Sequence, residues 1–254
     1  MTKQAEIDYF ANMNEDARRY AGRKPFSADQ RGAYLLDIGQ IFSLIPPPPR
    51  RLLDLGCGSG WTTAMYAQAG YDALGVDLAP AAISLATGLF APTGARFEVH
   101  DFEALPFSGR FDIAVIYDCL HHADREREVV KSVFRALAGG GEILVMEPGR
   151  GHHDSQGSQI AVQAHGVTEK DMPPSLTTRL LRAAGFADIR VFPRAQFQIA
   201  EREGTGGVTR RLEPLLGPRV AALVKTLKNS VFTGGNGVVT ARKPAGPSAA
   251  SRMG

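Results

Sequence analysis

The sequence has few of the residues that mark a disulfide-linked, zinc-stabilised or membrane-spanning protein. Its 254 residues include two cysteines, Cys57 and Cys119, and neither lies in a CxxC or CxxH pattern of a structural zinc site. Both lie in apolar stretches, so we expect buried free thiols in a reducing compartment. No apolar run approaches the roughly 20 residues that span a bilayer, and no segment resembles a signal peptide. We therefore expect a cytoplasmic protein without a membrane span.

Long runs of charge are also missing. The net charge is +3 and the isoelectric point is about 8.9, which is weak support for a nucleic-acid partner. Basic residues occur in pairs, at Arg18–Arg19, Arg50–Arg51 and Arg210–Arg211, as expected of solvated surfaces. With 44% apolar and 22% charged residues, the composition is that of a folded protein. The length allows one sizeable α/β domain.

Residues 1–49 are predicted to be a helical segment followed by a linker. Apolar residues recur at helical spacing in EIDYFANMNEDARRYAG and again in SADQRGAYLLDIGQIFSLI. The four prolines from Pro46 to Pro49 cannot continue a helix, so they predict a stiff, extended connector.

From Arg51 onward, short β-like runs alternate with helical patterns. This alternation predicts βαβ units and a mainly parallel sheet with helices on both faces, which is a Rossmann-like three-layer α/β fold. The expected strands are 51–56, 72–78, 95–101, 111–118 and 139–148, and the expected helices are 61–70, 80–90 and 124–137.

The chain changes character after Gly149. We expect a polar, glycine-rich loop at 149–159, a helix within 168–185, a strand at 187–197 and a last short strand at 236–243. Residues 204–230 form a basic amphipathic segment, predicted as a helical insertion that covers a pocket, forms a dimer or binds a membrane surface. Residues 244–254 are predicted to be a disordered tail.

The stretch DLGCGSG, from Asp54 to Gly60, links the first strand to its helix. A phosphate-binding P-loop would need GxxxxGK followed by Ser or Thr, and this stretch has no lysine. The dinucleotide fingerprint is GxGxxG, whereas this stretch reads GxGxG and has Trp61 in place of the third glycine. Glycines here allow positive φ and leave no Cβ between the backbone and a ligand. An acidic residue in front of the glycines would favour a ligand with positive charge.

Further motifs follow in a fixed order. Asp77 ends the second expected strand in LGVDLAP, where a carboxylate can accept from both ribose hydroxyls. Asp101 follows the third strand in VHDFEALPF, and FDIAVIYDCLHHAD and LAGGGEILVMEP come next. This series resembles the class I S-adenosylmethionine-dependent methyltransferases, closely over residues 50–150 and more loosely to 192.

The resemblance implies S-adenosylmethionine as cofactor and a seven-stranded sheet of order 3-2-1-4-5-7-6, parallel except for its last strand. It further implies that residues 50–243 form the methyltransferase domain, that 1–49 cover the cofactor as a lid, and that Asp101 accepts from the adenine amino group. The implied cofactor-binding residues are Tyr20, Asp54, Gly56, Cys57, Gly58, Gly60, Asp77, Leu78, Asp101, Phe102 and Tyr117.

Candidates for the chemistry follow the fourth and fifth strands. His121 and His122 come after strand four, where a neutral imidazole suits a general base, although adjacent side chains rarely face the same way. Glu147 ends strand five and either binds an acceptor or forms a structural ion pair. His152, His153 and Asp154 lie on the next loop, as a substrate-facing segment or as metal ligands. Because no spacing fixes a ligand geometry, no metal is predicted.

The function predicted from the sequence is methyl transfer from S-adenosylmethionine to oxygen or nitrogen of a small metabolite, by a monomer or homodimer. The chain lacks the Asn-Pro-Pro-Tyr element of DNA amino-methyltransferases and any appended nucleic-acid module, so no nucleic-acid partner is predicted. Two alternatives remain open: a protein or RNA methyltransferase, and a non-catalytic protein that binds the cofactor as a regulator.

Overall fold

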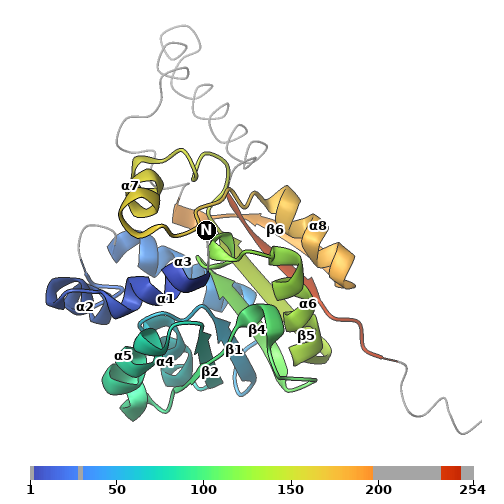
Figure 1. Ribbon diagram of the computed structural model, residues 1–254. Helices are drawn as coiled ribbons and strands as arrows, with labels where there is room; N and C mark the ends of the chain where they lie inside the picture. Colours follow the sequence, from blue (N-terminus) through green and yellow to red (C-terminus); the bar gives the residue numbers. More distant parts are fainter. Residues whose placement is uncertain (1–2, 28–30, 197–235, 247–254) are drawn as a thin grey trace, which may run out of the picture.

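The computed structural model describes residues 3–27, 31–196 and 236–246 (Figure 1). The predicted insertion at 204–230 and most of the predicted tail at 244–254 lie outside these residues. Within them, no helix is long and apolar enough to cross a membrane.

In the described part of the chain, seven strands form one sheet with the order β3-β2-β1-β4-β5-β7-β6. All neighbouring strands are parallel except that β7 runs antiparallel to both β5 and β6. This confirms the fold class and the strand order that the motifs implied. The strands are β1 (Arg51–Leu55), β2 (Asp72–Asp77), β3 (Arg96–Val99), β4 (Phe111–Tyr117), β5 (Leu137–Glu147), β6 (Ala187–Pro193) and β7 (Gly237–Arg242).

Helices cover both faces of the sheet, because the central strands are apolar on both sides. Helices α6 (Glu126–Ala136) and α8 (Pro174–Ala184) pack on one face, against a core that includes Leu53 and Leu55. Helices α3 (Arg31–Leu44) and α4 (Trp61–Gln68) pack on the other face, around Leu52. Helix α5 (Pro80–Phe90) contacts α4, β2 and β3. The three-layer arrangement therefore follows from the alternation along each strand.

The N-terminal segment is divided more finely than its helical spacing suggests. It forms α1 (Lys3–Ala11), α2 (Glu15–Gly22) and α3. Asn14 begins α2 as an N-cap whose side chain accepts from the amide of Ala17, and a capping residue of this kind starts a new helix. Helix α1 packs against α5 and against α7 (Gln156–His165), at the carboxyl ends of the strands (Figure 1).

The prediction of a loop over 149–159 is wrong at its end. Helix α7 begins at Gln156, where the Ser155 hydroxyl accepts from the amide of Ser158 as an N-cap. The helix predicted within 168–185 is α8, and it begins only at Pro174, because Pro173 and Pro174 exclude a continuous helix from 168. Residues 166–173 form neither helix nor strand, and the amide of Met172 donates to the carbonyl of Pro148, just after β5.

Candidate active site

A cavity of about 460 Å³ opens at the carboxyl ends of β1, β2 and β4, which is where ligands bind in open α/β sheets. Segments far apart in the sequence line it, from α1 and α2 to the segment after α7. Its walls include most of the residues that the sequence singled out: Tyr20, Gly56, Cys57, Gly58, Asp77, Leu78, Asp101, Phe102, Tyr117, His121, His122 and His152. Asp54, Gly60 and Glu147 are not among the lining residues.

The glycine turn forms one wall, and two of its glycines have different roles. Gly56 has φ +64°, and a Cβ there would lie 2.4 Å from the Cβ of Cys119. Gly58 has φ +51° and faces the cavity, with Phe10 of α1 3.3 Å from an ideal Cβ position. The turn thus needs glycine both for its backbone conformation and for the close approach of its neighbours. Phe10 lies directly over it.

Asp77 connects the end of β2 to the glycine turn. Its Oδ2 accepts from the amide of Gly58 at 3.0 Å, and its Oδ1 accepts from the amide of Ala79 at 2.9 Å. Burial raises the pKa of this carboxyl, and the two donating amides partly offset that effect. Asp77 therefore holds the turn in place while it lines the cavity, a position compatible with the predicted ribose contact.

Asp54 lies beneath the turn rather than in the cavity. Its Oδ2 accepts from the hydroxyls of Thr62 and Thr63, each at 2.6 Å, at the first turn of α4. Burial raises the pKa of Asp54 to about 6, although both hydroxyl donors lower it. A cofactor contact by Asp54 stays a prediction, and a direct contact does not fit this position. Gly60 likewise packs against Ala86 and Phe97 instead of facing the cavity.

Helix α1 covers the cofactor side of the cavity. Lys3 forms ion pairs with Asp101 at 2.6 Å and with Glu103 at 2.8 Å. Asp101 also accepts from the amide of Glu103 through its Oδ1. The sequence pattern did not predict that Lys3 contacts the carboxylate proposed to bind adenine, because nothing in the N-terminal periodicity fixes where α1 packs.

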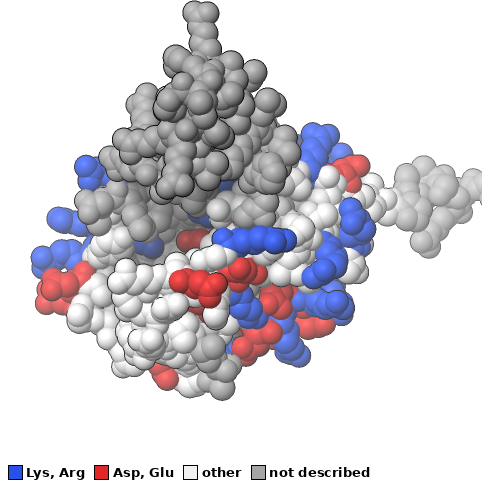
Figure 2. Space-filling model, turned by 90° about the horizontal axis from the view of Figure 1, so that it is seen from above, with Lys and Arg blue, Asp and Glu red and all other residues white. Residues whose placement is uncertain are grey.

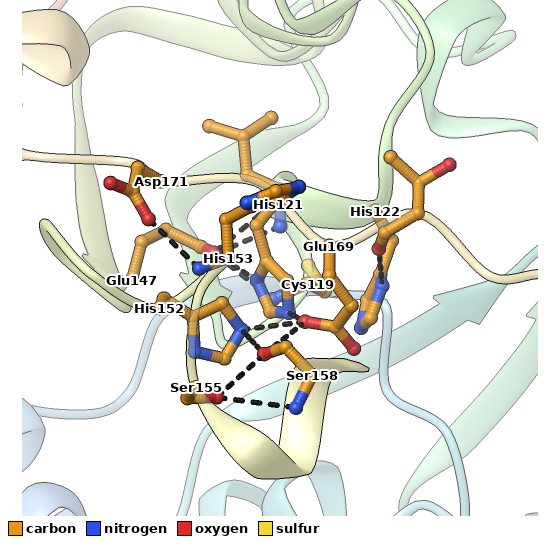
Figure 3. A network of polar contacts seen from close by, with 12 residues as sticks. Cys119, His121, His122, Glu147, His152, His153, Ser155, Ser158, Glu169 and Asp171 are labelled. Carbon is orange, nitrogen blue, oxygen red and sulfur yellow. Dashed lines mark hydrogen bonds and ion pairs between the residues drawn. The ribbon is translucent and has the colours of Figure 1, made fainter. Parts of the chain in front are cut away.

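Glu147 is hydrogen-bonded to Nδ1 of His121 and thereby orients the imidazole ring (Figure 3). The glutamate is buried and accepts from the amides of Cys119, Leu120 and His121, and its Oε2 lies 2.7 Å from Nδ1 of His121. Burial lowers the pKa of His121, but the hydrogen bond and charge of Glu147 outweigh it, and the pKa rises to about 8. The structure thus favours the ion-pair alternative for Glu147 over direct contact with an acceptor.

Three imidazole rings of the cavity lining gather around one carboxylate (Figure 3). Ring centroids lie 3.9 Å apart for His121 and His122, and 5.0 Å apart for His121 and His152. Glu169 joins them, with its Oε2 2.6 Å from Nε2 of His152 and 3.6 Å from Nε2 of His121. Burial raises the pKa of Glu169, and the hydrogen bond from His152 with the neighbouring imidazoles brings it below its usual range.

Sequence reasoning missed Glu169 and Glu6 as cavity residues. Glu169 follows a helix that was not predicted, so no pattern connected it with His121. By contrast, His153 and Asp154, which were weighed together with His152, bond to each other at an exposed position. His165 lies away from the imidazole cluster and contacts the ring of Tyr9.

The comparisons with known proteins agree with this geometry. A sequence family described as a methyltransferase domain matches residues 53–145. That stretch holds the glycine turn, Asp77 and Asp101 in the order of the motifs. Residues 53–145 thus match a methyltransferase domain, and the comparisons support a class I S-adenosylmethionine-dependent methyltransferase.

The chain is similar to methyltransferases that are named for different acceptors. Ajmaline N-methyltransferase of Rauvolfia serpentina is 29% identical over 44% of the chain and 42% of its own length. Ubiquinone biosynthesis O-methyltransferase of Bordetella avium is 31% identical over 37% of the chain and 41% of its own length. The alignments thus span about two fifths of these curated relatives.

A solved structure extends the comparison of folds beyond the matched stretch. Phosphoethanolamine N-methyltransferase 2 of Haemonchus contortus, in complex with S-adenosyl-L-methionine, superposes with a TM-score of 0.65 at 18% identity, covering 94% of this chain and 60% of the other. At that identity the likeness establishes the fold. S-adenosylmethionine is the cofactor of the methyltransferase family to which the domain belongs.

Proposed function

We propose that this methyltransferase transfers a methyl group from S-adenosylmethionine to an oxygen or nitrogen atom of a small-molecule metabolite. The observation that carries the proposal is that one cavity of the described residues is lined by two unlike groups of side chains. The first group is the glycine turn, Asp77 and Asp101, where the family motifs would bind the cofactor. The second is the histidines and Glu169, where an acceptor would lie.

Methyl transfer requires few catalytic groups from the protein. A lone pair of the acceptor attacks the methyl carbon, the carbon–sulfur bond breaks, and its electron pair stays on sulfur as neutral S-adenosylhomocysteine. The leaving group is already activated, so the protein has to align the acceptor and remove its proton where the acceptor carries one. The predicted roles of His121 and His122 in proton removal belong to this step. Glu147 would orient His121.

The volume of the cavity and the charge of the surrounding surface support a small acceptor. The cavity volume lies within the range of small-molecule sites, about 300–1,000 Å³. Seen from above, the described residues of this face carry lysine and arginine side chains interspersed with aspartate and glutamate (Figure 2). A nucleic-acid substrate would call for a continuous basic patch.

Transfer of labelled methyl groups tests the proposal. Purified protein is incubated with methyl-labelled S-adenosylmethionine and a cell extract, and the products are separated into metabolite, RNA and protein fractions. We expect the label in the metabolite fraction, and no label with heat-inactivated protein. Label confined to RNA or protein would contradict the small-molecule acceptor, whereas cofactor binding without any transfer would support the regulatory alternative.

A further inference from the structure

We propose that the imidazoles of His121 and His122 and the carboxylate of Glu169 bind a divalent transition-metal ion. His152 would be the fourth ligand. One ligand atom from each of the first three residues lies within 4.8 Å of the other two. In a tetrahedral site with bonds of about 2.1 Å, ligand atoms lie about 3.4 Å apart. His121 Nε2 and Glu169 Oε2 are already 3.6 Å apart, so forming the metal site requires side-chain movements on the order of 1 Å.

Both adjacent histidines are held by their Nδ1 atoms, which leaves Nε2 for the metal. Nδ1 of His122 lies 2.6 Å from the carbonyl oxygen of Thr168, which can only accept, so this nitrogen carries the proton. Nδ1 of His121 donates in the same way to Glu147. Metal-binding histidines commonly donate their other ring N–H to a carboxylate or a backbone carbonyl. Both kinds of partner are present here: the Glu147 carboxylate for His121 and the Thr168 carbonyl for His122.

His152 completes the arrangement from the loop before α7. Its Nε2 lies 2.6 Å from Glu169 Oε2 and 3.3 Å from the Ser158 hydroxyl. The same nitrogen therefore points at the carboxylate around which the other two rings gather (Figure 3). With it, the cluster offers three imidazoles and one carboxylate, a set that suits Zn²⁺ and similar ions, whereas Mg²⁺ prefers oxygen ligands throughout.

Charge at this end of the cavity favours a cation. Glu147 is buried and Glu169 is partly buried within the cluster, and Glu6 approaches His122 Nδ1 to 3.7 Å. The nearest lysine along the chain, Lys170, is bound to the carbonyl of Ala123 and the carboxylate of Glu126. A divalent ion bound here would place positive charge among these carboxylates.

The position suggests what the metal would do, and this step rests on the proposed function. A divalent ion that takes the acceptor hydroxyl as a fifth ligand would lower the pKa of that hydroxyl. Because His121 and His122 would then be metal ligands rather than bases, the hydroxyl proton would pass to water, the oxygen lone pair would attack the methyl carbon, and sulfur would keep the electron pair of the broken bond. Such a site favours an oxygen acceptor, such as a phenol or an enol, over an amine.

Titration with Co²⁺, followed by displacement with Zn²⁺, tests the site without any acceptor. Protein freed of metal by a chelator is titrated while the visible absorption of Co²⁺ is recorded. We expect one ion per chain with a spectrum of low coordination number. Glu169→Gln and His122→Asn should each weaken binding by about tenfold or more, as even outer-shell changes do at metal sites. His153→Asn, which alters an exposed histidine on the same loop, should leave affinity unchanged.

Two measurements separate the possible failures. Calorimetric binding of S-adenosylmethionine by each variant shows whether it has folded, so weak metal binding by an unfolded protein is recognised. Absence of Co²⁺ binding by the folded parent chain would overturn the proposal, and so would binding that the double variant Glu169→Gln/His122→Asn retains in full. Metal binding without methyl transfer would instead count against the proposed function and leave the metal site standing.

Discussion

Lys3 Nζ lies 2.6 Å from Asp101 Oδ2 and thereby ties the first helix to the loop after β3. The same ammonium group lies 2.8 Å from Glu103, which also pairs with Arg125. These contacts hold α1 over the wall that the family motifs assign to the cofactor. Release of the product cofactor then requires Lys3 to leave its two carboxylates.

Replacing Lys3 should therefore speed cofactor release. We expect Lys3→Met to raise the dissociation rate of S-adenosylhomocysteine by about 2- to 5-fold, because partly exposed ion pairs contribute up to about 1 kcal/mol. Stopped-flow displacement of the bound product measures the rate. The control is Gln4→Met, which alters the next residue. The Gln4 side chain donates to Asp8 of its own helix, so this variant should release the product at the parent rate. Equal rates for both variants would show that Lys3 does not hold α1 closed.

Asp77 should matter most for cofactor affinity. Asp77→Ala removes the acceptor of the Gly58 and Ala79 amides together with the predicted ribose contact. We expect the affinity for S-adenosylmethionine to fall about 10- to 100-fold, since hydrogen bonds to charged groups contribute roughly 1.5–3 kcal/mol. Isothermal titration calorimetry measures it.

The matched control for this experiment lies on the same strand. Asp72→Ala removes an exposed carboxylate at the other end of β2, which pairs with Arg96. Its affinity for the cofactor should equal that of the parent chain. Unchanged binding by Asp77→Ala as well would remove the assigned role of Asp77.

Asp54 makes stability depend on pH in a defined direction. Its pKa in the folded protein is about 6, above the ordinary 3.8, because it is buried. Folding therefore favours the protonated carboxyl, and the stabilisation is complete below pH 3.8 and lost as the pH rises through 6. Relative to Asp54→Asn, the parent chain should lose on the order of 2–3 kcal/mol between about pH 4 and pH 7.

Thermal unfolding of the two proteins across this pH range measures the effect. The asparagine keeps an oxygen that can accept from Thr62 and Thr63, so the comparison isolates the charge. A difference in Tm between the two proteins that stays constant from pH 4 to pH 7 would mean that Asp54 titrates normally in the folded state.

Asp37 should be critical for stability rather than for catalysis. It is buried on α3, and it accepts from Arg194 Nε at 3.1 Å and from the Tyr117 hydroxyl at 3.0 Å. Because removal of one partner leaves a buried charge uncompensated, Asp37→Ala should lower the free energy of unfolding by about 3–5 kcal/mol. Urea denaturation measures the change.

The same helix offers a control of opposite sign. Gly39 lies within α3, and a Cβ there meets no atom within 4 Å. Gly39→Ala should therefore raise the free energy of unfolding by about 0.5–1 kcal/mol. If Asp37→Ala behaves like an ordinary surface substitution, with a change below about 0.5 kcal/mol, the buried ion pair contributes little.

The cofactor side could be predicted from sequence because its signals are local. Glycines at 56, 58 and 60 have positive φ in the folded chain, and Asp77 and Asp101 stand at the end of β2 and shortly after β3, two strands predicted from short β-like runs. These features need only a strand, a turn and a helix in succession.

The acceptor side could not be predicted in the same way. Glu169 lies near His121 only because the chain folds back at α7, which separates the two residues in the sequence. The first turn of α7 is polar and glycine-rich, so it was not predicted as a helix. Likewise, the spacing of apolar residues in α1 does not say that Lys3 contacts Asp101. Contacts of this kind depend on how separate elements pack, which periodicity along one element does not record.

The matched domain ends at residue 145, and Lys3, His152 and Glu169 all lie outside it. The glycine turn, Asp77 and Asp101 thus lie in one continuous stretch of sequence, whereas α1 and part of the histidine cluster come from flanking segments. Changes in those flanks can alter which acceptor fits while the donor turn keeps its geometry. The same donor site can in this way serve different acceptors when the flanking segments change.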